Sequence, residues 1–286
     1  MTYQQRTPIG FAARLFPNYW RPLRQEIAFA ERHGFDCFQV RGQLNGLTEE
    51  QLGDDYASLA RALNDAKIFA TMEIVVLLDA EGRSQLGTRP LDVLKANLPA
   101  IEQLACSHVH LHMAPQHKAP EETWLKLEER LLEELAACNR LAQERGFRFA
   151  FEHNEPDIRL FPNAERSLTV LQQNPELGFV WDFNHSPPQE ATCYIEYARQ
   201  LAVLHVSDTP APELNYHLPL GMGTLDIDAY CRGLLQAGFE GPSILEIGGL
   251  PKSGGFGRDT DEALIESAAR LRNAWQKAYA ALESNS

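Results

Sequence analysis

The sequence contains four potential ligands for a divalent cation, which are Glu152, Asp182, His205 and Glu246. Each follows a short apolar run that is typical of a β-strand, and the stretches between them are long enough for a helix. If these strands are parallel neighbours, their carboxyl ends lie at one edge and the four side chains converge there. Three carboxylates and one imidazole suit one divalent metal ion, with Mn²⁺, Mg²⁺, Co²⁺ and Zn²⁺ all compatible.

Short apolar runs recur along the whole chain and predict eight strands alternating with helices. Their lengths and their Val, Ile and Phe content are typical of buried parallel strands. Strict alternation favours a single (β/α)₈ TIM barrel, whose functional residues lie at the C-terminal ends of the strands. An open doubly wound sheet would usually carry a glycine-rich phosphate turn after its first strand, and residues 14–18 read Arg-Leu-Phe-Pro-Asn instead. The predicted strands cover residues 9–15, 36–41, 68–77, 108–113, 147–151, 177–181, 202–206 and 243–247.

Helix signals occupy the intervals between these runs. Residues 48–51 read Thr-Glu-Glu-Gln, a capping box that predicts one helix with Leu52, Tyr56, Leu59 and Leu63 on its inner face. Further helices are predicted over 22–32, 121–145 and 261–282, and Gly34 and Gly146 are expected to end the first two. The glycine-rich stretch 248–257 is expected to be a loop beside the ligand edge.

The bulk composition describes one globular domain. The 286 residues suit one barrel, so the domain is expected to span residues 1–286, and 44% hydrophobic residues supply an ample core. The formal net charge of −13 argues against a nucleic-acid surface, because such surfaces are usually basic. No apolar run approaches the length of a membrane span.

The cysteines and the N-terminus favour a cytoplasmic protein. Five cysteines are scattered along the chain with no Cys-x-x-Cys pair, which fits a reducing compartment better than a disulfide framework. Residues 1–8 are polar and lack the apolar segment of a secretory signal.

The residues around the four candidate ligands sharpen the prediction. They read Phe-Glu-His-Asn at 151–154, Trp-Asp-Phe-Asn-His at 181–185, Leu-His-Val-Ser-Asp at 204–208 and Leu-Glu-Ile-Gly-Gly at 245–249, and His217 precedes Gly-Met-Gly at 221–223. This set resembles the strand-end pattern of the xylose-isomerase-like barrel superfamily, which is Glu, Asp-x-x-His, His-x-x-Asp, His-x-x-x-Gly-x-Gly, Glu. The superfamily includes sugar isomerases and epimerases, inosose dehydratases, hydroxypyruvate isomerases and endonuclease IV. The resemblance is strong from about residue 146 to 249.

The resemblance implies a metal centre and a reaction. It implies that Glu152, Asp182, His205 and Glu246 bind the metal, and that Glu152 and Glu246 exchange a proton with the substrate from opposite faces. The implied function is a metal-dependent isomerase or epimerase of a small sugar, ketose or keto acid, acting through an enediolate. A dehydratase of the inosose or 3-dehydroshikimate type is the alternative, with His153 or His185 as an extra acid or base. A non-catalytic sugar-binding barrel is a third possibility.

Four further polar residues are expected to contact the substrate. His185 follows Asp182 by three residues and could bind substrate, hold a second metal or orient the ligands. His217 lies just before the Gly-Met-Gly turn at 221–223, and Asn154 follows Glu152 by two residues. In the fourth strand, alternation places His108, His110 and His112 on one face, with His112 at the rim and His110 inside the barrel with a hydrogen-bond partner. Asp208 is expected to shape its loop.

The expected partner is a small carbohydrate-like molecule. Endonuclease IV is similar in pattern but requires further histidines, including one after the third strand, where this chain reads Thr-Met-Glu-Ile-Val at 71–75. That difference and the acidic composition argue against DNA repair. A dimer or tetramer is possible, as in many barrels of this superfamily, and neither nucleic acid nor membrane is an expected partner.

Overall fold

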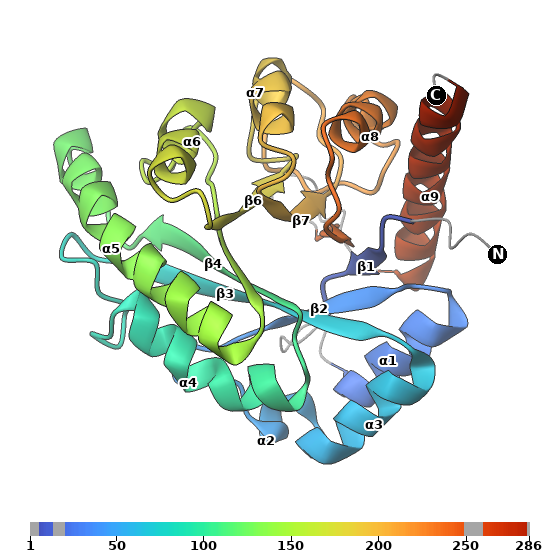
Figure 1. Cartoon of the computed structure of the whole chain (residues 1–286), viewed down its shortest axis with the longest axis horizontal. Coiled ribbons are helices and arrows are strands. Elements are labelled where there is room, and N and C mark those ends of the chain that lie inside the picture. Colours follow the sequence, from blue (N-terminus) through green and yellow to red (C-terminus); the bar gives the residue numbers. More distant parts are fainter. Residues whose placement is uncertain (1–5, 14–20, 249–259, 285–286) are drawn as a thin grey trace.

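The predicted (β/α)₈ barrel is confirmed. The computed structural model, drawn in Figure 1, describes residues 6–13, 21–248 and 260–284. Its eight strands form one parallel sheet in the order β1-β8-β7-β6-β5-β4-β3-β2. A parallel bridge between Ala12 and Gln39 brings the chain after β1 against β2 and nearly closes the barrel. The strands are β1 (Ile9–Phe11), β2 (Cys37–Arg41), β3 (Phe69–Leu78), β4 (His108–Pro115), β5 (Arg148–Glu152), β6 (Gly178–Asp182), β7 (Leu201–Val206) and β8 (Ser243–Leu245).

Helices surround the strands on the outside of the barrel (Figure 1). The long helix α9 packs on α8 and β1, so the two ends of the described chain lie side by side. The helices are α1 (Leu23–Arg32), α2 (Glu49–Leu52), α3 (Tyr56–Ala66), α4 (Pro90–Gln103), α5 (Glu121–Arg145), α6 (Ala164–Gln173), α7 (Ala191–Glu196), α8 (Ile227–Gln236) and α9 (Asp261–Ser284), with a 3₁₀ turn η1 (Pro188–Glu190) before α7. In the described part of the chain, no helix is long and apolar enough to cross a membrane.

One helix prediction was wrong in its length. The capping box at Thr48 is present, because the Thr48 side chain accepts the Gln51 N–H and the Gln51 side chain accepts the Thr48 N–H. The helix it opens ends after Leu52, where Gly53 takes the left-handed φ of 76°. Asp55 then caps a new helix by accepting the Ser58 N–H at 2.8 Å. A left-handed glycine followed by an N-cap aspartate divides the single predicted helix into α2 and α3.

The strand predictions agree with the structure to within a few residues, except at β1. This strand ends at Phe11, whereas the prediction extended it to residue 15. Residues 14 and 15 lie outside the described part, as does most of the glycine-rich stretch predicted to be a loop. Gly146 ends α5 in the left-handed conformation as predicted, with a φ of 79°.

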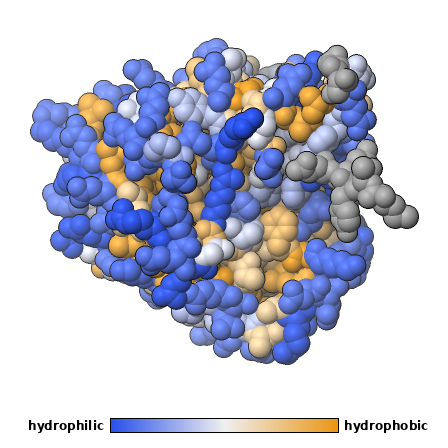
Figure 2. Space-filling model, viewed as in Figure 1, coloured by the Kyte–Doolittle hydropathy of each residue, from blue (hydrophilic) through white to orange (hydrophobic). Residues whose placement is uncertain are grey.

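The barrel interior changes from apolar to polar along the strands. Near its amino-terminal end, small and branched side chains pack in a buried cluster of Cys37, Ala150, Val180, Ala202, Val203 and Ile244. Side chains two residues apart share one face of a strand. The inward positions that follow are Gln39, Glu152, Asp182, His205 and Glu246, so the apolar layer forms a floor for a polar layer at the carboxyl end. Outside, most of the face in Figure 2 is hydrophilic, with smaller apolar patches between.

Candidate metal centre

The four predicted metal ligands converge at the carboxyl end of the barrel. Glu152, Asp182, His205 and Glu246 each offer one ligand atom, and these atoms all lie within 4.8 Å of one another. The first three side chains are fully buried, whereas that of Glu246 is 22% exposed. Because they come from β5, β6, β7 and the residue after β8, four consecutive strands supply one ligand each.

His205 lies between the two glutamates of this group. Its Nδ1 is 3.2 Å from Glu152 Oε1 and 3.3 Å from Glu246 Oε2. Its Nε2 lies 3.0 Å from Gln39 Oε1, which accepts the Nε2–H. The Gln39 amide is itself oriented, since its Nε2 faces Glu73 Oε2 at 3.5 Å. Gln39 therefore directs Nδ1, and not Nε2, toward the carboxylates.

The donor set fits a divalent cation. Glu152 Oε2 and Asp182 Oδ2 are buried and have no hydrogen-bond partner among the described residues. A carboxylate oxygen buried without a partner is costly and is normally explained by a missing ligand, water or ion. A cation bound among the four side chains would satisfy both oxygens, and carboxylate with imidazole is a ligand combination that Mn²⁺, Co²⁺ and Zn²⁺ accept.

The electrostatics of the group depend on its imidazoles. Burial would raise the pKa of Glu152, but the imidazoles of His112 and His205 hold it well below its ordinary value. The pKa of Glu246, which burial would likewise raise, is lowered to about 2, chiefly by His205. Burial would lower the pKa of His205, yet the two glutamates raise it well above its ordinary value. Burial raises the pKa of Asp182. Without a metal, the glutamates are therefore ionised and His205 carries the compensating proton.

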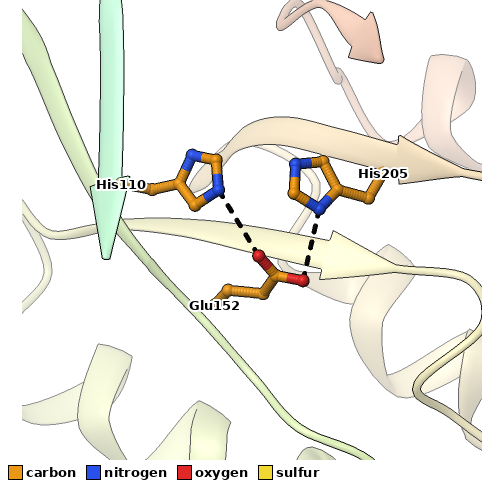
Figure 3. A group of neighbouring side chains, drawn as sticks. All are labelled: His110, Glu152 and His205. Carbon is orange, nitrogen blue, oxygen red and sulfur yellow. Dashed lines mark hydrogen bonds and ion pairs between the residues drawn. The ribbon is translucent and has the colours of Figure 1, made fainter. Parts of the chain in front are cut away.

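His110 supports Glu152 from inside the barrel. Figure 3 shows the Glu152 carboxylate between the rings of His110 and His205, which reach it from β4 and β7. His110 Nε2 is 3.4 Å from Glu152 Oε2, and the two ring centres are 5.0 Å apart. The interior position of His110 was predicted, but its hydrogen-bond partner was not found, because neither ring nitrogen has one among the described residues.

The four predicted substrate contacts lie together around a pocket of about 390 Å³ above the metal ligands. Its described walls contain His112, Asn154, His185 and His217, together with Glu246. Seven further lining residues were not predicted from the sequence: Arg41, Glu73, Val75, Ala114, Glu155, Ile158 and Asn215. Glu73 could have been recognised from its inward-facing place on the third strand, two residues after Thr71.

Asn154 fixes His112 at this pocket. The Asn154 Nδ2 donates to the carbonyl oxygens of Met113 and Leu160, both at 2.7 Å, so its Oδ1 must face His112. That oxygen accepts the His112 Nε2–H at 3.0 Å. Burial would lower the pKa of His112, but the charges of Glu152 and Glu73 raise it to about 10. Asn154 therefore acts on the pocket through His112.

Asp208 and His153 have structural positions. The Asp208 carboxylate accepts the backbone N–H groups of Thr209, Gly221 and Leu225, so it shapes its loop as predicted. His153 is fully buried, its Nε2 accepts the Asp182 N–H at 3.2 Å, and burial lowers its pKa to about 3. It is not among the described residues that line the pocket, so the structure does not support it as an acid or base.

Comparison with known proteins agrees with this architecture. The model of the xylose isomerase-like TIM barrel family matches residues 27–274. The chain belongs to this family. No curated protein sequence matches the chain significantly.

Solved structures share the fold of this xylose isomerase-like barrel over nearly its whole length. An L-ribulose 3-epimerase is 18% identical, with a TM-score of 0.74 and 98% of each chain covered. The IolI protein with a bound zinc atom is also 18% identical, with a TM-score of 0.70, covering 95% of this chain and 99% of its own. D-psicose 3-epimerase from Clostridium cellulolyticum H10 is 12% identical, with a TM-score of 0.67, covering 95% and 98%. At these identities the similarity shows the common fold.

Proposed function

We propose that this chain is a divalent-metal-dependent isomerase or epimerase of a small sugar, ketose or keto acid. The observation that carries the proposal is the convergence of the ligand atoms of Glu152, Asp182, His205 and Glu246 within 4.8 Å of one another, beside a pocket of mixed lining. Further support comes from the family to which the chain belongs and from solved neighbours that include L-ribulose and D-psicose 3-epimerases.

These four side chains would hold one metal ion. When bound, such an ion polarises a substrate carbonyl and stabilises the negative charge of an enediolate. The two carboxylate oxygens that lack partners, one each on Glu152 and Asp182, are the strongest sign that the site is built for a cation. Mn²⁺, Mg²⁺, Co²⁺ and Zn²⁺ are all candidates, because the ligand set does not select one of them.

Glu152 and Glu246 are proposed as the acid and base. They belong to β5 and to the residue after β8, with β6 and β7 between them, so their carboxylates reach the centre from separated strands. Both have lowered pKa values and are present as carboxylates near neutral pH. As a carboxylate, one would remove the proton next to the substrate carbonyl and become protonated. The other would have to be protonated in the substrate complex to deliver its proton to the opposite face of the enediolate, so the two glutamates would end the turnover with their protonation states exchanged.

The pocket walls would bind the hydroxyl groups of the substrate. Imidazole and amide groups of His112, His185, His217 and Asn215 provide donors and acceptors around the cavity. Val75, Ala114 and Ile158 line other parts of it and offer apolar contacts. Such a mixed lining is typical of sites for small polar molecules.

We also propose that the whole chain forms one domain. The side-chain oxygen of Thr7, near the first described residues, lies 3.0 Å from the Tyr279 hydroxyl of α9. The carboxylate of Asp261 at the start of α9 accepts two hydrogen bonds from Arg21. These contacts join the two ends of the chain around the barrel.

Proton exchange tests the proposed reaction directly. The wild type, Glu152→Gln and Glu246→Gln would be incubated with ketoses, inososes and small keto acids in D₂O, with metal content measured in parallel. Glu102→Gln is the matched control, because Glu102 is an exposed partner of Arg145 far from the pocket lining. We expect metal-dependent deuterium at one substrate carbon in the wild type and control, and its loss in both site variants. A wild type that binds no divalent ion, or exchanges no proton with any candidate, contradicts the proposal.

Product analysis separates the dehydratase alternative from the isomerase. His185 lines the pocket and remains a candidate for the extra acid that a dehydratase needs, whereas His153 does not line it. A dehydratase product loses the mass of one water and often gains ultraviolet absorbance. An epimerase or isomerase product keeps the mass of the substrate, which is the result that we expect.

A further inference from the structure

The pocket wall contains a strained segment. Asn215 and His217 line the pocket, and both have left-handed backbone conformations, with φ values of 58° and 49°. Such conformations are costly for most residues other than glycine, less so for asparagine, and at His217 the surrounding structure must hold the backbone. The two side chains on this wall therefore depend on contacts made by the backbone of residues 215–217.

Asn184 supplies those contacts. Its backbone carbonyl accepts the Asn215 N–H at 2.9 Å. Its side-chain Oδ1 accepts the N–H groups of Tyr216 at 3.1 Å and His217 at 2.8 Å. Three consecutive backbone donors of the segment thus end on one residue. Asn184 is fully buried, and its Nδ2 donates to Ser207 Oγ at 2.7 Å, which fixes the orientation of the amide.

The same residue also contacts the proposed metal ligands. The Asn184 backbone N–H donates to Asp182 Oδ1 at 2.7 Å. Because that donor belongs to the main chain, it is independent of the Asn184 side chain. The Asn184 side chain contacts the pocket wall, whereas its backbone contacts the proposed ligand Asp182. A substitution at position 184 therefore removes the first contact and leaves the second.

The held conformation determines what His217 offers to the pocket. His217 Nδ1 lies 2.9 Å from the carbonyl oxygen of Glu246, which can only accept, so Nδ1 carries the hydrogen. Nε2 is then the ring nitrogen left for a substrate. Asn215 donates from Nδ2 to Glu155 Oε1, which joins the loops after β7 and β5 at the pocket rim. Both contacts require the backbone conformation that Asn184 stabilises.

We propose that Asn184 is a positioning residue that determines substrate affinity. It holds residues 215–217 so that His217 presents Nε2 to a substrate hydroxyl and Asn215 donates to Glu155 at the pocket rim. This inference rests on the proposed function for the nature of the substrate. Its structural part, the holding of the segment, can be measured without any substrate.

The test compares three variants. Asn184→Ala removes the side-chain acceptor and leaves the backbone bond to Asp182. Asn184→Asp keeps an oxygen for the Tyr216 and His217 N–H groups. Asn97→Ala is the matched control, because Asn97 is an equally buried asparagine whose Oδ1 accepts two backbone N–H groups, from Gln43 and Leu47, neither of which lines the pocket.

Amide hydrogen exchange and metal binding give readouts that need no substrate. In Asn184→Ala, we expect the Tyr216 and His217 amides to exchange at least about tenfold faster, as is appropriate for losing a buried hydrogen bond. The dissociation constant for Mn²⁺ should stay within about threefold of the wild type, because the Asp182 contact remains. Asn184→Asp should restore the protection of both amides, and Asn97→Ala should leave it unchanged. Unaltered exchange in Asn184→Ala would overturn the inference.

Steady-state kinetics distinguishes positioning from general destabilisation. With a substrate identified by proton exchange, Asn184→Ala should raise KM about tenfold while kcat falls less than about threefold, as expected when a ground-state contact is lost. Asn97→Ala should change neither by more than about twofold. A fall in kcat with unchanged KM in both alanine variants would show a purely structural role and refute the proposal. If the wild type turns over no substrate, the proposed function fails, and the exchange result alone still decides whether Asn184 holds the segment.

Discussion

Replacing Gln39 by leucine should weaken metal binding without removing any ligand. Gln39 is buried, at 2% exposure, and its Oε1 accepts the His205 Nε2–H at 3.0 Å. Leucine has a similar size but no acceptor, so the fully buried His205 would keep an N–H group without a partner. The backbone carbonyl of Gln39 still accepts the Ala13 N–H at 2.8 Å, so the contact that closes the barrel survives.

The size of the effect follows from these contacts. A buried donor left without a partner costs about 1–3 kcal/mol of folding stability. The second bond of Gln39, to Glu73 at 3.5 Å, is long, so its loss adds little to this cost in folding stability. Loss of the group that orients a metal-bound imidazole typically lowers metal affinity by about 10- to 100-fold, which equals about 1.4–2.8 kcal/mol.

Titration calorimetry with Mn²⁺ and thermal unfolding of the metal-free protein would measure the two quantities. Thr71→Val is the matched control, because the Thr71 hydroxyl is equally buried but has no hydrogen-bond partner among the described residues. We expect the control to bind Mn²⁺ within about twofold of the wild type. If Gln39→Leu lowers stability but leaves the dissociation constant for Mn²⁺ within about twofold, Gln39 contributes to stability alone, and its proposed role in directing His205 Nδ1 is refuted.

Three further predictions concern pH, the metal and a loop. The raised pKa of His205 keeps it protonated in the metal-free site, so Mn²⁺ binding should release about one proton. Below that pKa, the affinity of the protein for Mn²⁺ should rise about tenfold for each unit of increasing pH. Calorimetry in buffers of different ionisation enthalpy would detect the released proton. Chelation should lower the midpoint of thermal unfolding reversibly, since an ion at 100 times its dissociation constant contributes about 2.7 kcal/mol, and an unchanged midpoint would argue against a bound metal. Glu128→Gln should lower the free energy of unfolding by about 1–3 kcal/mol, because Glu128 accepts the Phe161 N–H and two hydrogen bonds from Arg166. Denaturant unfolding would measure this loss. The control Glu102→Gln, at an exposed ion pair, should change the free energy of unfolding by less than about 0.5 kcal/mol.

The convergence of the ligands could be predicted because it depends on local rules alone. Parallel strands place their carboxyl ends at one edge, and the period of two decides which side chains face inward. Once Glu152, Asp182 and His205 are assigned to strand ends, no further information is needed to bring them together. The break between α2 and α3 was also available in principle, from Gly53 and Asp55, but the inner-face periodicity of Leu52, Leu59 and Leu63 continues across it and concealed it.

The supporting contacts could not be predicted because they depend on how the barrel closes. Gln39 is far from His205 in the sequence, and the two meet only because β2 and β7 face each other across the interior. The motif at 181–185 contains Asn184, but its role depends on the left-handed backbone of Asn215 and His217, which neither residue type requires. A pattern of residue types identifies candidate ligands, whereas hydrogen-bond partners follow from the register and from loop conformations.

The two halves of the barrel contribute differently to the centre. The strands from β5 to β8 supply the four candidate metal ligands, whereas Gln39 on β2, Glu73 on β3 and His112 on β4 surround them from the other half. Glu73 links these neighbours, because one of its oxygens faces Gln39 Nε2 at 3.5 Å and the other faces His112 Nδ1 at 3.5 Å. It is therefore placed to affect both the orientation of His205 through Gln39 and the charge of His112 at the pocket wall. Substitutions at Glu73 should change metal affinity and substrate affinity together, while changes at the neighbouring Val75 should affect substrate binding alone.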